Sequence, residues 1–130
     1  MSTTGRQPAT ITTTLATTAR DLRRAVRAAD LAQTPGPGQL RDAGWQLTQL
    51  TGELTDLVTL LTEYTGHHIQ RPEQLRQVDG APATAPLASA CRELATLRHA
   101  LDTAHTAARA YYTELSQLTT AAPGPPRPAP

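Results

Sequence analysis

The stretch LRDAGWQLTQLTGELTDLVTLLTEYTG, residues Leu40–Gly66, decides the fold. Its apolar residues recur every seven positions in two rows set three positions apart, which are the a and d positions of a heptad. The a row is Leu40, Leu47, Leu54 and Leu61, and the d row is Ala43, Leu50, Leu57 and Tyr64. Because such rows are typical of a helix packed along another helix, they predict a helix over about residues 39–65, capped by Gly66.

A second stretch, about residues 86–120, repeats this pattern. Its a row is Leu87, Leu94, Leu101, Ala108 and Leu115, and its d row is Ala90, Leu97, Ala104, Tyr111 and Leu118. Pro86 suits the first turn of a helix, where its missing N–H costs nothing. Two long stretches with the same seven-residue period predict an antiparallel helical hairpin, a heptad-patterned coiled coil packed through its a and d rows.

A third apolar stripe lies nearer the N-terminus, over about residues 8–33. Its members follow in steps of three and four: Ile11, Leu15, Ala19, Leu22, Val26 and Ala29. This narrower stripe predicts a helix that packs alongside the hairpin. The predicted fold class is therefore all-α, a three-helix bundle built from the hairpin and a third, N-terminal helix.

Proline and glycine separate these segments, at residues 34–38 and 66–86. The longer break contains residues 72–78, for which we predict a short helical turn anchored by Leu75 and Val78. The bundle is expected to span residues 8–120, and residues 1–7 are expected to be disordered. The proline-rich tail, residues 121–130, cannot continue a helix and is also predicted to be disordered.

Threonine is unusually frequent in the middle helix, outside its apolar rows. The threonines of this helix are Thr48, Thr51, Thr55, Thr59, Thr62 and Thr65. Threonine lowers helix propensity by a few tenths of a kcal/mol per residue, roughly, relative to alanine. The helix is therefore expected to depend on packing, and its short neutral side chains leave a surface that another helix can approach closely.

Composition limits the classes of function. The net charge of +1 indicates no strong field toward nucleic acid or an anionic membrane, and no apolar run approaches a membrane span. Cys91 is the single cysteine, and residues 1–7 contain no apolar signal segment, so we expect a cytoplasmic protein. All twelve basic residues are arginine, and Phe and Asn are absent, a bias typical of a GC-rich bacterial genome.

No pattern indicates a catalytic, metal or cofactor site. His67 and His68 are adjacent and point apart on a helix, whereas His99 and His105 are six residues apart and do not share a face. Cys91 lies at an e position beside the apolar rows and is interpreted as a structural thiol. Phosphate-binding and nucleophile motifs are also absent, so the sequence predicts neither an enzyme nor a cofactor.

Two surfaces remain as candidates for binding. Trp45 falls at an f position, and Val58 and Leu60 widen the apolar stripe, so these three residues either pack under the first helix or bind a partner. Arginines gather on one face of the first helix as a possible contact for phosphates. They are Arg20, Arg23, Arg24 and Arg27, diluted by Asp21 and Asp30.

The sequence as a whole predicts a non-enzymatic helical scaffold or interaction protein. It would act by self-association or by binding another helical protein. The alternative is an accessory nucleic-acid-binding protein that uses the arginine face of the first helix.

Overall fold

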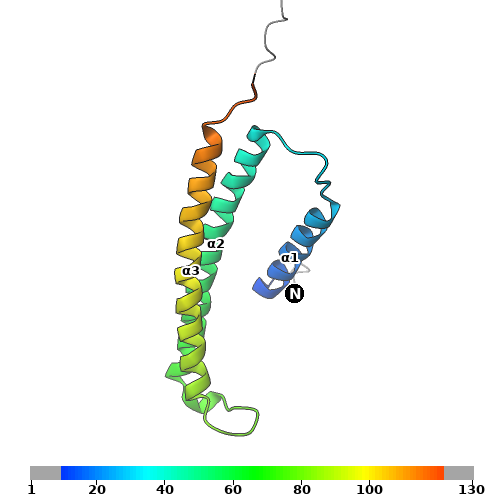
Figure 1. Ribbon diagram of the computed structural model, residues 1–130. Helices are drawn as coiled ribbons and strands as arrows, with labels where there is room; N and C mark the ends of the chain where they lie inside the picture. The colour runs from blue at the N-terminus through cyan, green and yellow to red at the C-terminus, as the bar shows by residue number, and fades with distance from the viewer. Residues whose placement is uncertain (1–9, 122–130) are drawn as a thin grey trace, which may run out of the picture. The chain divides into compact units, whose positions relative to one another are not determined.

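The computed structural model describes residues 10–121, in which three α-helices and one short 3-10 helix follow one another (Figure 1). The helices are α1 (Ile11–Ala28), α2 (Pro37–Gln70), η1 (Pro72–Gln74) and α3 (Thr84–Ser116). Within these residues the only β pairing is an isolated bridge between Arg76 and Pro82. The predicted all-α class is confirmed. The predicted disordered ends, residues 1–7 and 121–130, lie outside the described residues except for Ala121.

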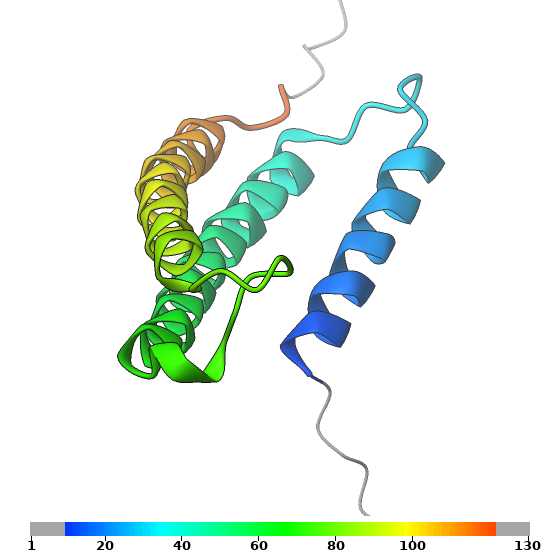
Figure 2. The same cartoon turned by 90° about the horizontal axis from the view of Figure 1, so that it is seen from below.

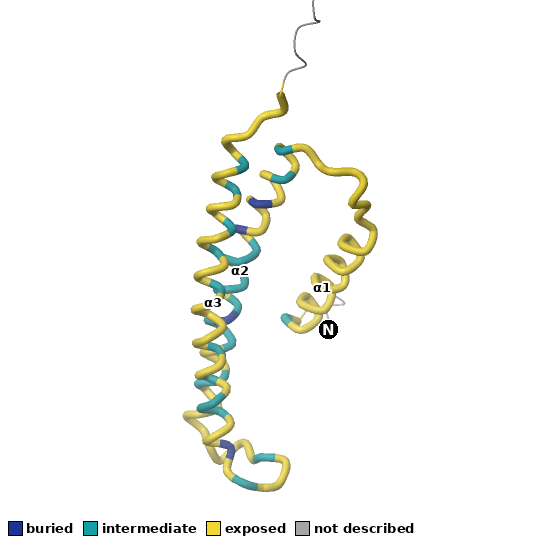
Figure 3. Tube along the Cα trace, viewed as in Figure 1, coloured by how far each residue is buried: buried dark blue, intermediate teal, exposed yellow. Residues whose placement is uncertain are grey.

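The chain divides into two compact units, residues 1–34 and residues 35–130. The first contains α1, which begins where the Thr10 hydroxyl accepts a hydrogen bond from the Thr13 N–H at 3.1 Å. The helix α1 is exposed along almost its whole length, and none of its residues is buried (Figure 3). The packing of this helix as the third member of a bundle stays a prediction.

The second unit is the expected antiparallel pair, and α2 and α3 lie side by side along most of their length (Figures 1 and 2). Gly36 caps α2, and Pro37 opens it at a position where proline is favoured. The helix then continues to Gln70, so the predicted end at Thr65 is wrong. Gly66 lies inside the helix without the positive φ that a capping glycine adopts.

The connection from α2 to α3 also differs from its prediction. Only Pro72–Gln74 is helical, and Val78 is fully exposed rather than an anchor. A tight turn follows, in which the Gln77 N–H donates to the Ala81 carbonyl at 2.8 Å. Gly80 has a φ of 88° in this turn, a value that residues with a Cβ rarely adopt. Ala83 is the buried residue at this end of the hairpin.

The line along which α2 packs on α3, here called the seam, is not the predicted pair of a and d rows. On α2 the buried residues are Gly44, Thr48 and Val58, whereas Leu47 is 49% and Tyr64 50% exposed (Figure 3). On α3 the a row is partly buried as expected, but its partner row contains Cys91, His105 and Tyr112 instead of Leu97 and Tyr111. The seam of α2 is thus turned by about one residue, or about 100°, from the leucine rows.

The small residues of α2 explain this rotation, because they let the two backbones come close together. A Cβ placed on Gly44 would lie 2.8 Å from Cδ1 of Tyr111 and 3.3 Å from Cα of Tyr112. The close approach thus occurs at Gly44, a glycine, and the expectation for the threonines stays a prediction.

The threonine hydroxyls in and beside the seam have hydrogen-bond partners on their own helix. Thr48 is buried and donates to the Gly44 carbonyl at 2.9 Å, and Thr55 donates to the Thr51 carbonyl at 3.0 Å. The same bond to the carbonyl four residues earlier is made by Thr51, Thr59, Thr62 and Thr65. Threonine can therefore enter the seam without leaving a buried hydroxyl unpaired.

Candidate interaction surfaces

The rotation of the seam leaves the a and d rows of α2 and the d row of α3 outside it, half-buried or exposed, whereas the a row of α3 stays in the seam. When each helix is viewed from its own N-terminus, its d row lies on the same rotational side of the seam. Because the helices are antiparallel, equal displacements bring the two rows to the same side of the hairpin. We call this side the open apolar face. Its residues are Leu47, Leu50, Leu54, Leu57, Leu61 and Tyr64 of α2, with Ala90, Leu97, Ala104 and Tyr111 of α3.

The open apolar face holds large apolar side chains that the hairpin leaves partly exposed. Leu97 is 46% and Tyr111 41% exposed, similar to Leu47 and Tyr64 on the other helix. By contrast, Val58 and Ala83 are the only buried hydrophobic residues among those described. The face therefore exposes large side chains, whereas few hydrophobic residues of the described chain are fully buried.

The charged residues that border the open apolar face are acidic. The g positions lie next to the d rows, and they carry Glu53 on α2 and Glu93 and Glu114 on α3, all exposed. His67 occupies the last g position of α2, and no arginine falls at a g position of either helix. The face is thus an apolar strip with a sparse acidic border.

The structure does not bring together the three residues predicted as a partner patch. Val58 is only 4% exposed and belongs to the seam, so it offers no surface to a partner. Leu60 is partly buried at a g position, beside the open apolar face. Trp45 is 46% exposed but lies on the other side of the seam from the open apolar face. Its ring packs there against the ring of Tyr112, with an angle of 53° between the ring planes and centroids 5.3 Å apart.

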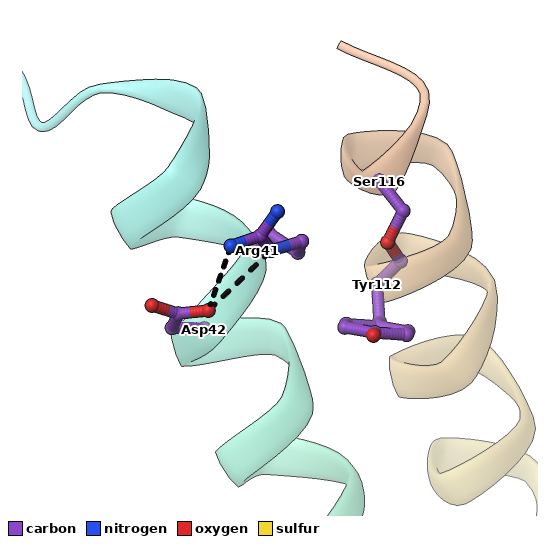
Figure 4. Close-up of polar contacts among 4 residues, drawn as sticks. All are labelled: Arg41, Asp42, Tyr112 and Ser116. Atoms are coloured by element: carbon purple, nitrogen blue, oxygen red, sulfur yellow. Dashed lines mark hydrogen bonds and ion pairs between the residues drawn. The ribbon is translucent and has the colours of Figure 1, made fainter. Parts of the chain in front are cut away.

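Trp45 and Tyr112 belong to an open groove on the side of the hairpin away from the open apolar face. The other residues that line it are Arg41, Asp42, Gln46 and Ser116. Arg41 and Asp42 form an exposed ion pair at 3.4 Å, and Tyr112 and Ser116 lie on the facing helix (Figure 4). Exposed ion pairs contribute little to stability, so this groove is a polar surface around one aromatic contact.

The arginine face of the first helix is present in α1. Arg20, Arg23, Arg24 and Arg27 line one shallow depression together with Ala28. None of the four forms an ion pair among the described residues, where the only salt bridge is that of Arg41 with Asp42. The four guanidinium groups thus form a basic cluster on α1.

The residues that could support catalysis are engaged in packing or stand apart. His105 lies in the seam, with Nδ1 3.0 Å from the hydroxyl of Thr51. Cys91 is a partly buried free thiol beside α2. His67 and His68 line a depression at the end of α2 with Tyr64 and Arg71. Across residues 10–121, no three His, Cys, Asp or Glu side chains stand close enough to hold a metal ion.

Sequence reasoning missed the seam, although a signal for it is present. Gly44, Thr48, Thr51, Thr55 and Val58 follow in steps of four and three, which is a second heptad-spaced stripe. Counting only apolar residues hides this stripe, because its members are small or polar.

Comparison of the chain with protein-family models, with curated proteins and with solved structures finds no match. Among the described residues, no helix is both long and apolar enough to cross a membrane.

Proposed function

We propose that this chain is a non-enzymatic helical interaction protein whose hairpin binds apolar helices along the open apolar face. The partner is either a second copy of the chain or another helical protein. The observation that carries this proposal is the exposure of heptad-spaced side chains, such as Leu47, Leu97 and Tyr111, on one side of the hairpin.

The small core of the hairpin supports this proposal. A helix pair gains most of its stability from the packing of its apolar stripe, and small proteins with little buried surface commonly add a partner. Here the stripe is outside the seam, and no large side chain is fully buried among the described residues. An additional apolar surface against the open apolar face would complete the packing that the sequence pattern encodes.

The proposal is tested by capturing partners on the immobilised chain from cells that express it. Ala104→Glu places a carboxylate in the open apolar face, whereas Ala95→Glu makes the same change at an exposed position on the other side of the seam. We expect Ala104→Glu to release partners that the wild-type chain and the Ala95→Glu variant both retain. Equal retention by both variants would contradict a binding role for this face. A captured untagged copy of the chain identifies self-association.

The three-helix bundle is the competing use of this face, with α1 as the cover. The apolar stripe of α1, which includes Leu15, Leu22 and Val26, is exposed and has the spacing that such packing needs. In that arrangement the chain satisfies its own apolar rows and binds partners elsewhere.

A second candidate function is nucleic-acid binding through α1. It is favoured by the shared depression of Arg20, Arg23, Arg24 and Arg27. If all four contact phosphates, log Kd should rise by roughly 3.6 for each tenfold increase in salt concentration. Replacing the four with glutamine should then abolish binding to duplex DNA, and retention of binding would contradict this function.

A further inference from the structure

We propose that the occupant of the open apolar face is a second copy of this chain, in a symmetric four-helix dimer. The inference rests on the proposed function and deepens it by naming the partner. In this dimer the two-fold axis runs parallel to the helices. The helix α2 of one copy then lies along α3 of the other, and the two connecting loops lie at the same end.

The width of the face favours a hairpin as its cover. The d rows that face the same side extend from Ala43 to Tyr64 on α2 and from Ala90 to Tyr111 on α3, which corresponds to about 32 Å along each of two helices. The helix α1 has 18 residues, or about 27 Å, and presents one narrow stripe. A second hairpin has two helices of 34 and 33 residues, so it matches the face in both length and width.

The register of the hairpin places the two d rows at matching heights. The contacts of Gly44 with Tyr111 and of Thr51 with His105 fix this register. Steps of seven residues from the contact of Gly44 with Tyr111 place Thr51 at the height of Ala104, Val58 at that of Leu97 and Thr65 at that of Ala90. The d-row residue of α2 precedes each of these by one position, or about 1.5 Å. The d-row neighbours are therefore Ala43 with Tyr111, Leu50 with Ala104, Leu57 with Leu97, and Tyr64 with Ala90.

The side chains in these pairs complement one another in size. The two-fold axis preserves height, so Tyr64 of one copy faces the second copy's Ala90, and Leu50 faces the second copy's Ala104. At the remaining heights a tyrosine faces an alanine and a leucine faces a leucine. Alternation of large and small residues across facing helices fills a bundle without voids or clashes.

The acidic border favours this arrangement over the other symmetric one, in which α2 packs on α2 of the second copy and α3 on its α3. If α2 instead lay on α2 of the second copy, Glu53 would meet its own counterpart near the middle of the face. In the proposed arrangement Glu53 lies between the heights of the second copy's Ala100 and Ala107, more than about 12 Å along the helix from the second copy's Glu93. Like charges are thereby kept apart.

The size of the face allows a weak dimer. A strip about 32 Å long and about 15 Å wide, spanning two helices whose axes are about 9 Å apart, offers roughly 500 Å² on each copy. Two copies would bury about 1,000 Å² in total, which is the size of a weak, transient interface. We therefore expect a dimer that dissociates on dilution.

Light scattering on the full chain across a range of concentrations tests the dimer. We expect a molar mass of twice 13.9 kDa that falls toward 13.9 kDa on dilution. Ala104→Glu should raise the dissociation constant by at least about tenfold, because it buries two carboxylates per dimer, whereas Ala95→Glu should leave it unchanged. A monomer at all concentrations, or equal dissociation constants for the two variants, would overturn the inference.

Disulfide trapping between separate chains tests the arrangement. In a Cys91→Ser background, a chain with Leu50→Cys is mixed with a chain carrying Ala104→Cys. The proposed dimer brings these positions together, so a covalent heterodimer should form, and a mixture of Leu50→Cys with Ala95→Cys should form none. Covalent dimers of a chain carrying Glu53→Cys alone, in the same background, would indicate the other arrangement and overturn the proposed one.

These results separate the inference from the proposed function. A monomeric chain that still captures a different protein, and loses it with Ala104→Glu, contradicts the dimer and keeps the function. A chain with neither self-association nor a partner sensitive to Ala104→Glu contradicts both.

Discussion

At the scale of single residues, small side chains decide where the two helices meet. Gly44 allows the ring of Tyr111 and the backbone of Tyr112 to approach α2 within van der Waals distance of its missing Cβ. The same helix contains Gly66, which has no atom within 4 Å of its Cβ position. The two glycines therefore have the same intrinsic helix propensity in different surroundings, and a comparison between them isolates the contribution of packing.

We expect Gly44→Ala to destabilise the protein and Gly66→Ala to stabilise it. Alanine gains about 1 kcal/mol over glycine inside a helix, which is the full effect expected at Gly66. At Gly44 the added methyl group would lie 2.8 Å from Tyr111 Cδ1, and overpacking of this kind costs about 1–3 kcal/mol. Thermal unfolding followed by circular dichroism at equal protein concentration should show shifts of opposite sign. An equal rise in both midpoints would contradict the close approach at Gly44.

The contact between Thr51 and His105 is the second feature at this scale. It is the only side-chain hydrogen bond between α2 and α3 among the described residues, at 3.0 Å. Thr51→Val keeps the shape and the branched Cβ but leaves Nδ1 of His105 without its partner, a loss of about 1 kcal/mol. Thr62→Val removes a hydroxyl that bonds only to its own helix and should change stability by less than about 0.5 kcal/mol. Urea denaturation of both variants measures the difference, and equal losses would argue against the interhelical bond.

At the scale of the elements, the sequence predicted the helices well and their mutual orientation poorly. Heptad rows and proline or glycine breaks located all three helices, because periodicity and backbone restrictions are local properties. The seam depends instead on which faces come closest, and there Gly44 and Thr48 override the leucine rows. For the same reason Val58, predicted at the edge of the stripe, is buried, and Leu97, predicted in it, is exposed.

The heptad pattern also did not predict where α2 ends or which glycine forms the turn. Gly66 resembled a cap, but the helix continues through it to Gln70. The left-handed conformation belongs to Gly80 in the turn before α3. That turn is fixed by backbone bonds between residues close in sequence, such as that of the Gly80 N–H to the Gln77 carbonyl at 2.8 Å.

Gly80 provides a test of this turn. Gly80→Ala should destabilise the hairpin by about 1 kcal/mol, because alanine is strained at a φ of 88°. Gly80→Asn should cost less, since asparagine tolerates the left-handed region. No atom lies within 4 Å of the Gly80 Cβ position, so steric clashes cannot explain a difference between the variants. Equal stability of the wild type and Gly80→Ala in urea denaturation would contradict the turn conformation.

At the scale of the whole molecule, the two units differ in charge as well as in structure. Residues 1–34 contain five arginines and two aspartates, for a net charge of +3, whereas residues 35–130 contain seven arginines and nine carboxylates, for a net charge of −2. The near-neutral total therefore conceals a basic unit and an acidic one. The basic unit carries the arginine face, and the acidic one carries the apolar face with its glutamate border.

Removal of residues 1–34 decides which unit supplies the stability of the molecule. Because α2, η1 and α3 form a compact unit by themselves, we expect the shortened chain to keep its hairpin, with an unfolding midpoint within about 4 °C of the full chain. It should also remain a dimer by light scattering, since the proposed interface uses α2 and α3 alone. A fall of more than about 10 °C, or aggregation of the shortened chain, would mean that α1 covers the open apolar face. The molecule would then be a three-helix bundle, and its partners would have to bind elsewhere.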